Sequence, residues 1–175
     1  MQTPADRAIQ SRRTFLVTMA GGLTGMGVLA PLATLHGQPN AAQPRPATLP
    51  AGVPRTITVY KDPNCGCCTA WVKHLQMSGF AVTAHDTSDM ATVKASMGVP
   101  KSLESCHTAR VGSYAIEGHV PADVIVKLLQ LKPAGLGLAV PGMPIGSPGM
   151  EGTPVDRYDI MLFDKSGKSR VFASR

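Results

Sequence analysis

Three of the four cysteines of this chain stand within four consecutive positions, directly after a short apolar segment. That segment, ITVY at residues 57–60, is rich in β-branched residues and ends at the turn signals of KDPN, so it predicts a buried strand. The sequence that follows places Cys65, Cys67 and Cys68 where a helix is expected to begin. A strand that leads straight into a helix favours folds that alternate strands and helices.

The helix after this turn has signals at both ends. Asp62 or Asn64 can cap its first turn, and Gly79 stands just past its last turn. The apolar residues between these ends recur at helical spacing: Cys68, Trp71, Val72 and Leu75.

The rest of the chain continues the alternation. The expected elements are a strand at 80–85, a helix at 88–98 with Ser88 as its N-cap, a strand with a glycine break at 108–118, a helix that opens at Pro121, a Gly/Pro-rich segment at 132–156, and a closing hairpin at 157–174. This order predicts an α/β sandwich with a parallel start and a C-terminal β-hairpin.

A strand that feeds a C-x-x-C at a helix N-terminus resembles the thioredoxin fold, and this resemblance implies a mixed sheet. In that fold the third core strand starts beside the C-x-x-C, and the residues SLESCHT precede that strand here. The resemblance therefore implies that Cys106 and His107 lie across from Cys65 and Cys68. Spacing alone does not bring position 106 to position 65.

The N-terminal region has the pattern of an export signal. Arg12 and Arg13, followed by an uncharged stretch at 15–32 rich in Gly, Ala and Thr, resemble a twin-arginine signal. The alternative is an uncleaved membrane anchor, but the four glycines of the stretch make it only weakly apolar. We expect a signal peptide at 1–36, a proline-rich disordered linker at 37–54, and a thioredoxin-like domain at 55–175, exported to the periplasm.

The cysteine cluster allows two kinds of chemistry. The free N–H groups and the dipole of a helix N-terminus stabilise thiolates, which attack disulfides and also bind soft metals. At about 100° per residue, Cys65 and Cys68 share nearly one helix face, whereas Cys67 points away from Cys65. A dithiol oxidoreductase needs Cys65 and Cys68 alone, but a metal site gains from a third sulfur. The separated cysteine pairs of zinc sites and the spacings of ferredoxin-type clusters are absent.

Methionine and histidine add candidate ligands. The tripeptide PGM occurs twice within residues 141–150 and places Met143 and Met150 in a Gly/Pro loop. These methionines either fill the edge of the core or supply thioethers, which suit Cu(I) and not zinc. His107 follows Cys106, and His119 stands at a strand-to-helix junction, so both are candidate ligands or hydrogen-bond partners of ligands. In a regular strand residues 106 and 107 face opposite ways, so both reach one site only where the backbone is irregular.

Several other polar residues are not expected to belong to a metal or catalytic site. We expect His74 and His85 on the surface and Lys61 as a surface lysine. Asp62 and Glu117 are lone carboxylates that we expect to cap a turn or to be solvated rather than to act as acid and base.

Composition excludes further classes of function. The formal net charge is +6, but the charges are scattered without a run of Lys or Arg, and aromatic residues make up only 5% of the chain. These features provide no nucleic-acid stacking platform and no basic patch. Motifs of serine hydrolases, zinc proteases and phosphate-binding loops are also missing.

Three motifs together resemble the CopG-type periplasmic copper-resistance proteins, a family catalogued as a domain of unknown function. The motifs are YKDPNCGCCTAWVKHL, SCHTARVGSYAIEGHVP and GLAVPGMPIGSPGME. The resemblance covers roughly residues 55–175 and implies a thioredoxin-like fold that binds copper through sulfur. It implies as metal ligands Cys65, Cys67, Cys68 and Cys106, with His107, His119, Met143 and Met150 as neighbours.

Two hypotheses follow. The first is a periplasmic copper-binding protein for copper resistance that holds Cu(I) on the four cysteines, with a multinuclear cluster because thiolates can bridge metals. Its partners are copper ions and other periplasmic copper-handling proteins, not nucleic acid, and no stable membrane insertion is expected after the leader is cleaved. The alternative is a thiol-disulfide or copper oxidoreductase whose catalytic residues are Cys65 and Cys68. The first hypothesis makes the chain a metal-binding protein rather than an enzyme.

Overall fold

The computed structural model describes residues 48–175. The predicted signal peptide and most of the predicted linker lie outside these residues. The described part contains the following elements: β1 (Thr56–Lys61), α1 (Gly66–Met77), β2 (Ala81–Asp86), α2 (Met90–Ser96), the short 3₁₀ helix η1 (Lys101–Leu103), β3 (Thr108–Val111), β4 (Tyr114–Glu117), α3 (Ala122–Leu131), β5 (Gly137–Ala139), β6 (Asp159–Phe163) and β7 (Ser169–Ser174).

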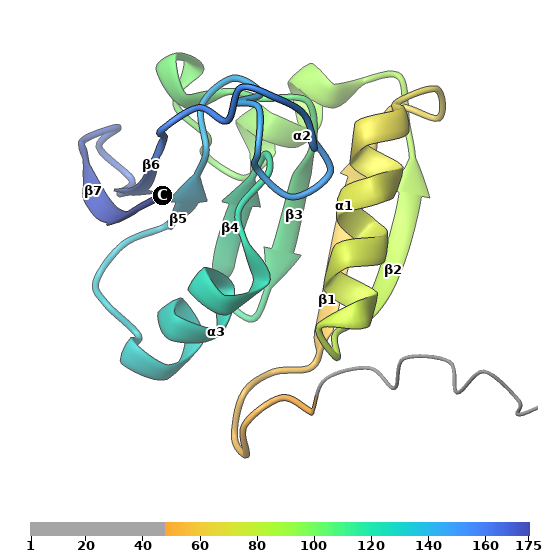
Figure 1. Ribbon diagram of the computed structural model, residues 1–175. Coiled ribbons are helices and arrows are strands. Elements are labelled where there is room, and N and C mark those ends of the chain that lie inside the picture. Colours follow the sequence, from red (N-terminus) through yellow and green to blue (C-terminus); the bar gives the residue numbers. More distant parts are fainter. Residues whose placement is uncertain (1–47) are drawn as a thin grey trace, which may run out of the picture. The chain divides into compact units, whose positions relative to one another are not determined.

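All seven of these strands form one mixed sheet in the order β2-β1-β3-β4-β5-β6-β7 (Figure 1). The pairs β1–β2 and β4–β5 are parallel, and the other four pairs are antiparallel. The mixed sheet, the cysteine motif before α1 and the closing β6–β7 hairpin confirm the predicted α/β class, and the arrangement is compatible with a thioredoxin-like fold.

Helices cover both faces of the sheet, and each face has its own core. Side chains of α1 and α3, such as Trp71 and Ile125, pack against Ile57 and Ile116 on one face. On the other face, residues of α2 and of the segment after it, such as Met97, form a smaller core. Successive residues of β4, such as Ala115 and Ile116, therefore enter different cores, as the period of a strand requires.

Helix α1 begins differently from the prediction. Its N-cap is Cys65, with φ −78° and ψ 96°, and the Cys65 sulfur accepts a hydrogen bond from the Cys68 N–H. Asp62 instead accepts a hydrogen bond from the Asn64 N–H and shapes the turn before the helix. The prediction that Asp62 or Asn64 caps α1 is therefore wrong, and the cap is a sulfur.

Three further features differ from the prediction. The segment 108–118 is a tight hairpin, β3–β4, because Gly112 adopts φ +56° between the two strands. Strand β5 lies inside the Gly/Pro-rich segment, where no strand was predicted. Gly137 has no room for a side chain there, since a Cβ would lie 2.1 Å from the Ala115 carbonyl oxygen. The N-cap of α2 is Asp89, not Ser88.

The packed region starts before the expected domain boundary at residue 55. Leu49 and Val53 are 5% and 8% exposed, and both belong to the larger core. The C-terminal end of the expected linker is therefore part of the folded region, because two apolar side chains in it find a face to cover.

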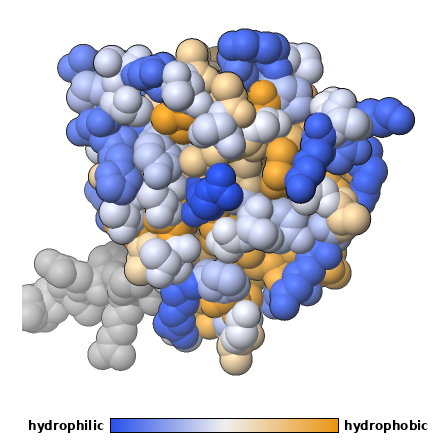
Figure 2. Space-filling model, turned by 180° about the vertical axis from the view of Figure 1, so that it is seen from behind, coloured by the Kyte–Doolittle hydropathy of each residue, from blue (hydrophilic) through white to orange (hydrophobic). Residues whose placement is uncertain are grey.

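The rear surface mixes hydrophobic and hydrophilic residues (Figure 2). Large hydrophobic side chains exposed among the described residues are Met77, Leu131, Met143, Val155 and Val171. Within residues 48–175, every helix is too short or too polar to cross a bilayer.

Candidate metal centre

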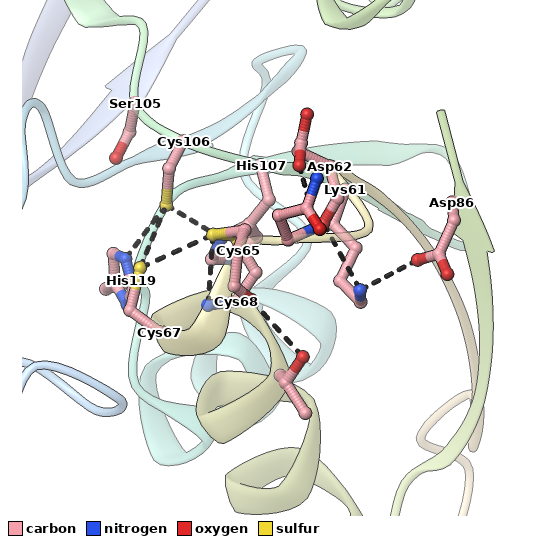
Figure 3. Close-up of a disulfide and its surroundings, with 12 residues drawn as sticks. Lys61, Asp62, Cys65, Cys67, Cys68, Asp86, Ser105, Cys106, His107 and His119 are labelled. Carbon is pink, nitrogen blue, oxygen red and sulfur yellow. Dashed lines mark hydrogen bonds and ion pairs between the residues drawn. A yellow bond between two sulfur atoms is a disulfide. The ribbon is translucent and has the colours of Figure 1, made fainter. Parts of the chain in front are cut away.

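Cysteine and histidine side chains from three parts of the chain meet at the start of α1. The turn before α1 supplies Cys65, Cys67 and Cys68, the loop before β3 supplies Cys106 and His107, and the junction between β4 and α3 supplies His119. In Figure 3 Cys106 points from its loop toward the cysteines of the helix start. This meeting of residues far apart in the sequence is the one implied by the thioredoxin resemblance.

The four cysteine sulfurs form one cluster. Cys65 and Cys68 are joined by a disulfide, and Cys67 and Cys106 are free thiols. The Cys67 sulfur lies 3.4 Å from that of Cys65 and 4.0 Å from that of Cys106. All four sulfurs lie within 4.8 Å of one another.

The prediction that Cys67 points away from Cys65 is wrong. It applied helical geometry to Cys65, but Cys65 is the cap and has extended backbone angles. The rotation of 100° per residue does not apply across such a cap, so the sulfurs of Cys65 and Cys67 converge.

A second group shares Cys106. The Cys106 sulfur lies 3.2 Å from His107 Nδ1 and 3.0 Å from His119 Nε2. Both histidines can approach one sulfur because residues 104–107 lie between η1 and β3 and have no regular strand geometry. The irregular backbone required for His107 to share a site with Cys106 is therefore present.

His107 is fully buried. Its ring lies 4.3 Å from that of Trp71, centroid to centroid, and its Nε2 atom has no hydrogen-bond partner. Burial lowers the pKa of His107 well below its usual value, and His119 and Lys94 lower it further. The ring is therefore neutral at physiological pH, the form in which imidazole binds metals.

His119 is held in a defined orientation. Its Nδ1 lies 2.8 Å from the Pro148 carbonyl oxygen, so Nδ1 carries the proton and donates to that oxygen. Nε2 then presents its lone pair toward Cys106. Burial lowers the pKa of His119, which also favours the neutral ring.

Cys106 is a weakly acidic thiol. Burial first, and the neighbouring Cys67 second, raise its pKa to about 12. A soft cation would replace the thiol proton and would compensate both causes, because it neutralises the charge that burial and Cys67 disfavour.

The loop at residues 141–150, which carries Met143 and Met150 and is called the methionine loop below, passes close to the cluster. Gly149 has φ +87°, and a Cβ on it would lie 2.6 Å from the Cys67 carbonyl oxygen, so the loop contacts the backbone of the α1 start. Met150 follows directly and is half-buried. Met143 is 51% exposed. Ligand roles for Met143 and Met150 stay predictions.

Comparison with known proteins agrees with this geometry. Residues 103–150 match the model of a family described as "Protein of unknown function, DUF411". Two solved structures, both of copper resistance protein CopG in two forms, are 48% identical to this chain. Each match covers 70% of this chain and 98% of the other, with a TM-score of 0.66. A search of curated proteins finds no match.

The chain belongs to the CopG copper-resistance family. Its copper-related function is supported by these relatives together with the sulfur cluster.

The structure also shows a buried ion pair next to this CopG-family site. Glu117 and Lys94 are 0% and 5% exposed, and Lys94 Nζ lies 2.6 Å from Glu117 Oε1. The expectation that Glu117 caps a turn or is solvated is wrong. The sequence contains one signal that was missed: Glu117 alternates with Ala115 along β4, so it points to the same face as α2.

Two other polar residues are less ordinary than expected. His74 is half-buried, and its Nε2 accepts a hydrogen bond from the Ala122 N–H, which joins α1 to the start of α3. Lys61 is 8% exposed and forms a 2.7 Å ion pair with Asp86. His85 is exposed, as expected.

Proposed function

We propose that this chain is a periplasmic copper-binding protein for copper resistance, which holds Cu(I) on the thiolates of Cys65, Cys67, Cys68 and Cys106. The observation that carries the proposal is the approach of four sulfurs to within 4.8 Å of one another. Thiolate sulfur is the ligand class that selects Cu(I). The relatives are named copper resistance proteins, which supports the same assignment.

The donor set suits more than one copper ion. A thiolate can bridge two metal ions, and Cys67 lies between Cys65 and Cys106. His107 and His119 add neutral nitrogen ligands beside Cys106. We therefore propose a multinuclear Cu(I) cluster, with Met143 and Met150 as neighbouring thioether ligands. Reduction of the Cys65–Cys68 disulfide precedes full loading, because a disulfide sulfur is a poor ligand.

Elemental analysis tests this proposal. Protein purified anaerobically from copper-grown cells is expected to contain more than one copper per chain and little zinc. Cys106→Ser removes the sulfur shared by both ligand groups and is expected to lose most of the copper, whereas Ser166→Ala in the β6–β7 turn is expected to retain it. A wild-type protein isolated with zinc, or with no metal, would contradict the proposal.

A second candidate function is supported by the disulfide itself. Cys65 and Cys68 form the C-x-x-C pair of an oxidoreductase, and the structure joins them. In this function the reduced pair gives one electron to each of two Cu(II) ions; the two thiols lose their protons, one S–S bond forms, and two Cu(I) ions result. The two functions are compatible.

The two candidates predict different results for Cys67. Reduced wild-type protein mixed with Cu(II) under argon is expected to form Cu(I) and one disulfide per chain if the pair is redox-active. Cys67→Ser would then keep the yield of the Cys65–Cys68 disulfide and of Cu(I), with the disulfide identified by peptide mapping, whereas Cys65→Ser would lose both. Equal metal loss from both variants, without Cu(II) reduction by wild type, would support binding alone.

The remaining predictions concern the N-terminal region. We propose that residues 1–36 are a twin-arginine signal that directs the protein to the periplasm and that the segment from 37 connects it to the folded domain. The Arg12-Arg13 pair supports this proposal. Interaction with other periplasmic copper-handling proteins is proposed on the same basis.

A further inference from the structure

The buried ion pair Lys94–Glu117 contacts the loop at residues 104–107, which carries Cys106 and His107. Lys94 approaches this loop from the face of the sheet opposite to α1. Lys94 belongs to α2, which covers the face of the sheet with the smaller core. His107 packs on Trp71 at the opposite face, which α1 and α3 cover. Glu117 is the last residue of β4, two positions before His119. The pair therefore lies directly behind the proposed metal centre.

Glu117 holds the backbone and a side chain on both sides of Cys106 and His107. Its Oε1 accepts hydrogen bonds from the Ser105 N–H at 2.6 Å and from Lys94 Nζ at 2.6 Å. Its Oε2 accepts one from the Thr108 hydroxyl at 2.6 Å. Ser105 and Thr108 are the residues that flank the Cys106-His107 pair, so one carboxylate fixes both ends of that pair.

The loop depends on this carboxylate at Ser105. The His107 carbonyl oxygen accepts a hydrogen bond from the Gly118 N–H, but the Ser105 N–H is paired with the Glu117 side chain. Residues 104–107 precede β3, and the carboxylate replaces the carbonyl that would pair with the Ser105 N–H in a sheet. Gly118 allows the close approach, since a Cβ on it would lie 2.6 Å from the Ser105 side chain. The Ser105 hydroxyl also donates to the Gly142 carbonyl oxygen, which connects this loop to the methionine loop.

Burying an ion pair inside a protein costs desolvation free energy. Apolar residues of similar volume often provide equal stability, because both charges lose their hydration on burial. A pair that also makes hydrogen bonds to a ligand-bearing loop contributes geometry in addition to packing.

We propose that Glu117, with Lys94 as its charge partner, is a positioning residue that sets where Cys106 and His107 stand relative to Cys67. Only the expected effect on metal binding rests on the proposed copper function. The positioning itself is a property of the metal-free protein.

Two double variants separate positioning from charge. Lys94→Met with Glu117→Leu replaces the pair by apolar residues and removes the acceptor for the Ser105 N–H. Lys94→Met with Glu117→Gln also removes both charges but keeps an amide oxygen as acceptor. Leu128→Ala, in the core beneath α3, serves as a control for lost stability away from the loop. Thermal unfolding verifies that each protein is folded.

The first readout needs no copper. In protein with the Cys65–Cys68 disulfide, diamide oxidises Cys67 and Cys106 to a second disulfide; two thiols lose two electrons and two protons to the diazene. Peptide mapping gives the rate. We expect the Leu double variant to react about tenfold more slowly or worse, and the Gln double variant and Leu128→Ala to react like wild type.

The second readout is Cu(I) affinity by competition with a chelator, together with the sulfur-to-copper charge-transfer absorption. We expect the Leu double variant to lose about 10- to 100-fold in affinity with a changed spectrum, and the Gln variant to recover both. Equal diamide rates in the wild type and both double variants would overturn the proposal whatever the copper result. If the Leu double variant reacted more slowly with diamide but the wild type bound no Cu(I), positioning would be upheld and the proposed copper function refuted.

Discussion

The acidity of Cys106 links its burial to metal binding. Burial and the adjacent Cys67 raise its pKa to about 12, far above the value near 8.5 of a free cysteine. The protonated thiol is therefore favoured in the folded protein, and this preference is lost only as the pH rises toward 12. Below that range a proton must leave when a metal binds, so Cu(I) affinity is expected to rise with pH.

Alkylation by iodoacetamide tests this pKa. The rate at Cys106, followed by peptide mapping, is expected to keep rising through about pH 10 in folded protein. In urea the alkylation rate at Cys106 should stop rising about one pH unit above the free-thiol pKa of about 8.5. Reduced access lowers the rate at every pH but does not move the profile. A folded-state profile that levels off near pH 9 would show that the thiol is not perturbed.

His74 makes stability depend on pH. Burial lowers its pKa, whereas Asp123 and Glu151 raise it, and the net direction is downward. Because the folded state disfavours the charged ring, the contribution is fully present above the unfolded pKa of about 6.5 and is lost as the pH falls through the lowered folded pKa. The loss is less than about 1 kcal/mol, since solvent screens a half-buried ring.

Urea unfolding between pH 7.5 and 5 measures this dependence. The free energy of unfolding of wild type is expected to fall more steeply below about pH 6.5 than that of His74→Gln. The variant keeps His107 and His119, whose pKa values are also lowered, so their contributions cancel in the comparison. Parallel curves for the two proteins would rule out a role for His74.

Among the elements, the methionine loop has a close backbone contact with the start of α1 at Gly149. Gly149→Ala places a Cβ against the Cys67 carbonyl at a φ of +87°, so it is expected to destabilise the fold by about 1–3 kcal/mol and to move the loop away from α1. Gly142→Ala is the matched control. It also has a positive φ, of +69°, but its Cβ would meet open space, so it should cost less.

Urea unfolding and Cu(I) affinity of both glycine variants distinguish the outcomes. The account expects the larger loss of both in Gly149→Ala. If the two variants were equally stable and bound copper equally well, the loop would not be held against the α1 start.

The sequence predicts elements well where apolar periodicity and turn residues agree. The β6–β7 hairpin, with Gly167 at φ +81° in its turn, and the helix from Pro121 match their predictions. Strand β5 was not predictable, since three residues in a Gly/Pro-rich segment have no period and pair only because β4 and β6 lie on either side. The cysteines were identifiable from clustering, but the approach of Cys67 depends on a cap conformation, and the Lys94–Glu117 pair depends on tertiary contact.

For the whole molecule, the proposed twin-arginine signal predicts export. Changing Arg12 and Arg13 together to Lys is expected to block export and to leave the protein in the cytoplasm, because twin-arginine signals require the pair. Cell fractionation with immunoblotting measures the distribution. Arg7→Lys is the control, and it should export normally. Unchanged periplasmic protein in the double variant would contradict a twin-arginine route.

The central claim is that four cysteine sulfurs from two distant parts of the chain bind Cu(I) together. A competition titration of fully reduced protein with Cu(I), under argon and against a chelator of known affinity, tests it most directly. The account predicts tight binding of more than one Cu(I) by wild type. It predicts at least a hundredfold weaker binding, about 2.7 kcal/mol, when Cys65, Cys67, Cys68 and Cys106 are all replaced by Ser. Equal affinities for the two proteins would contradict it.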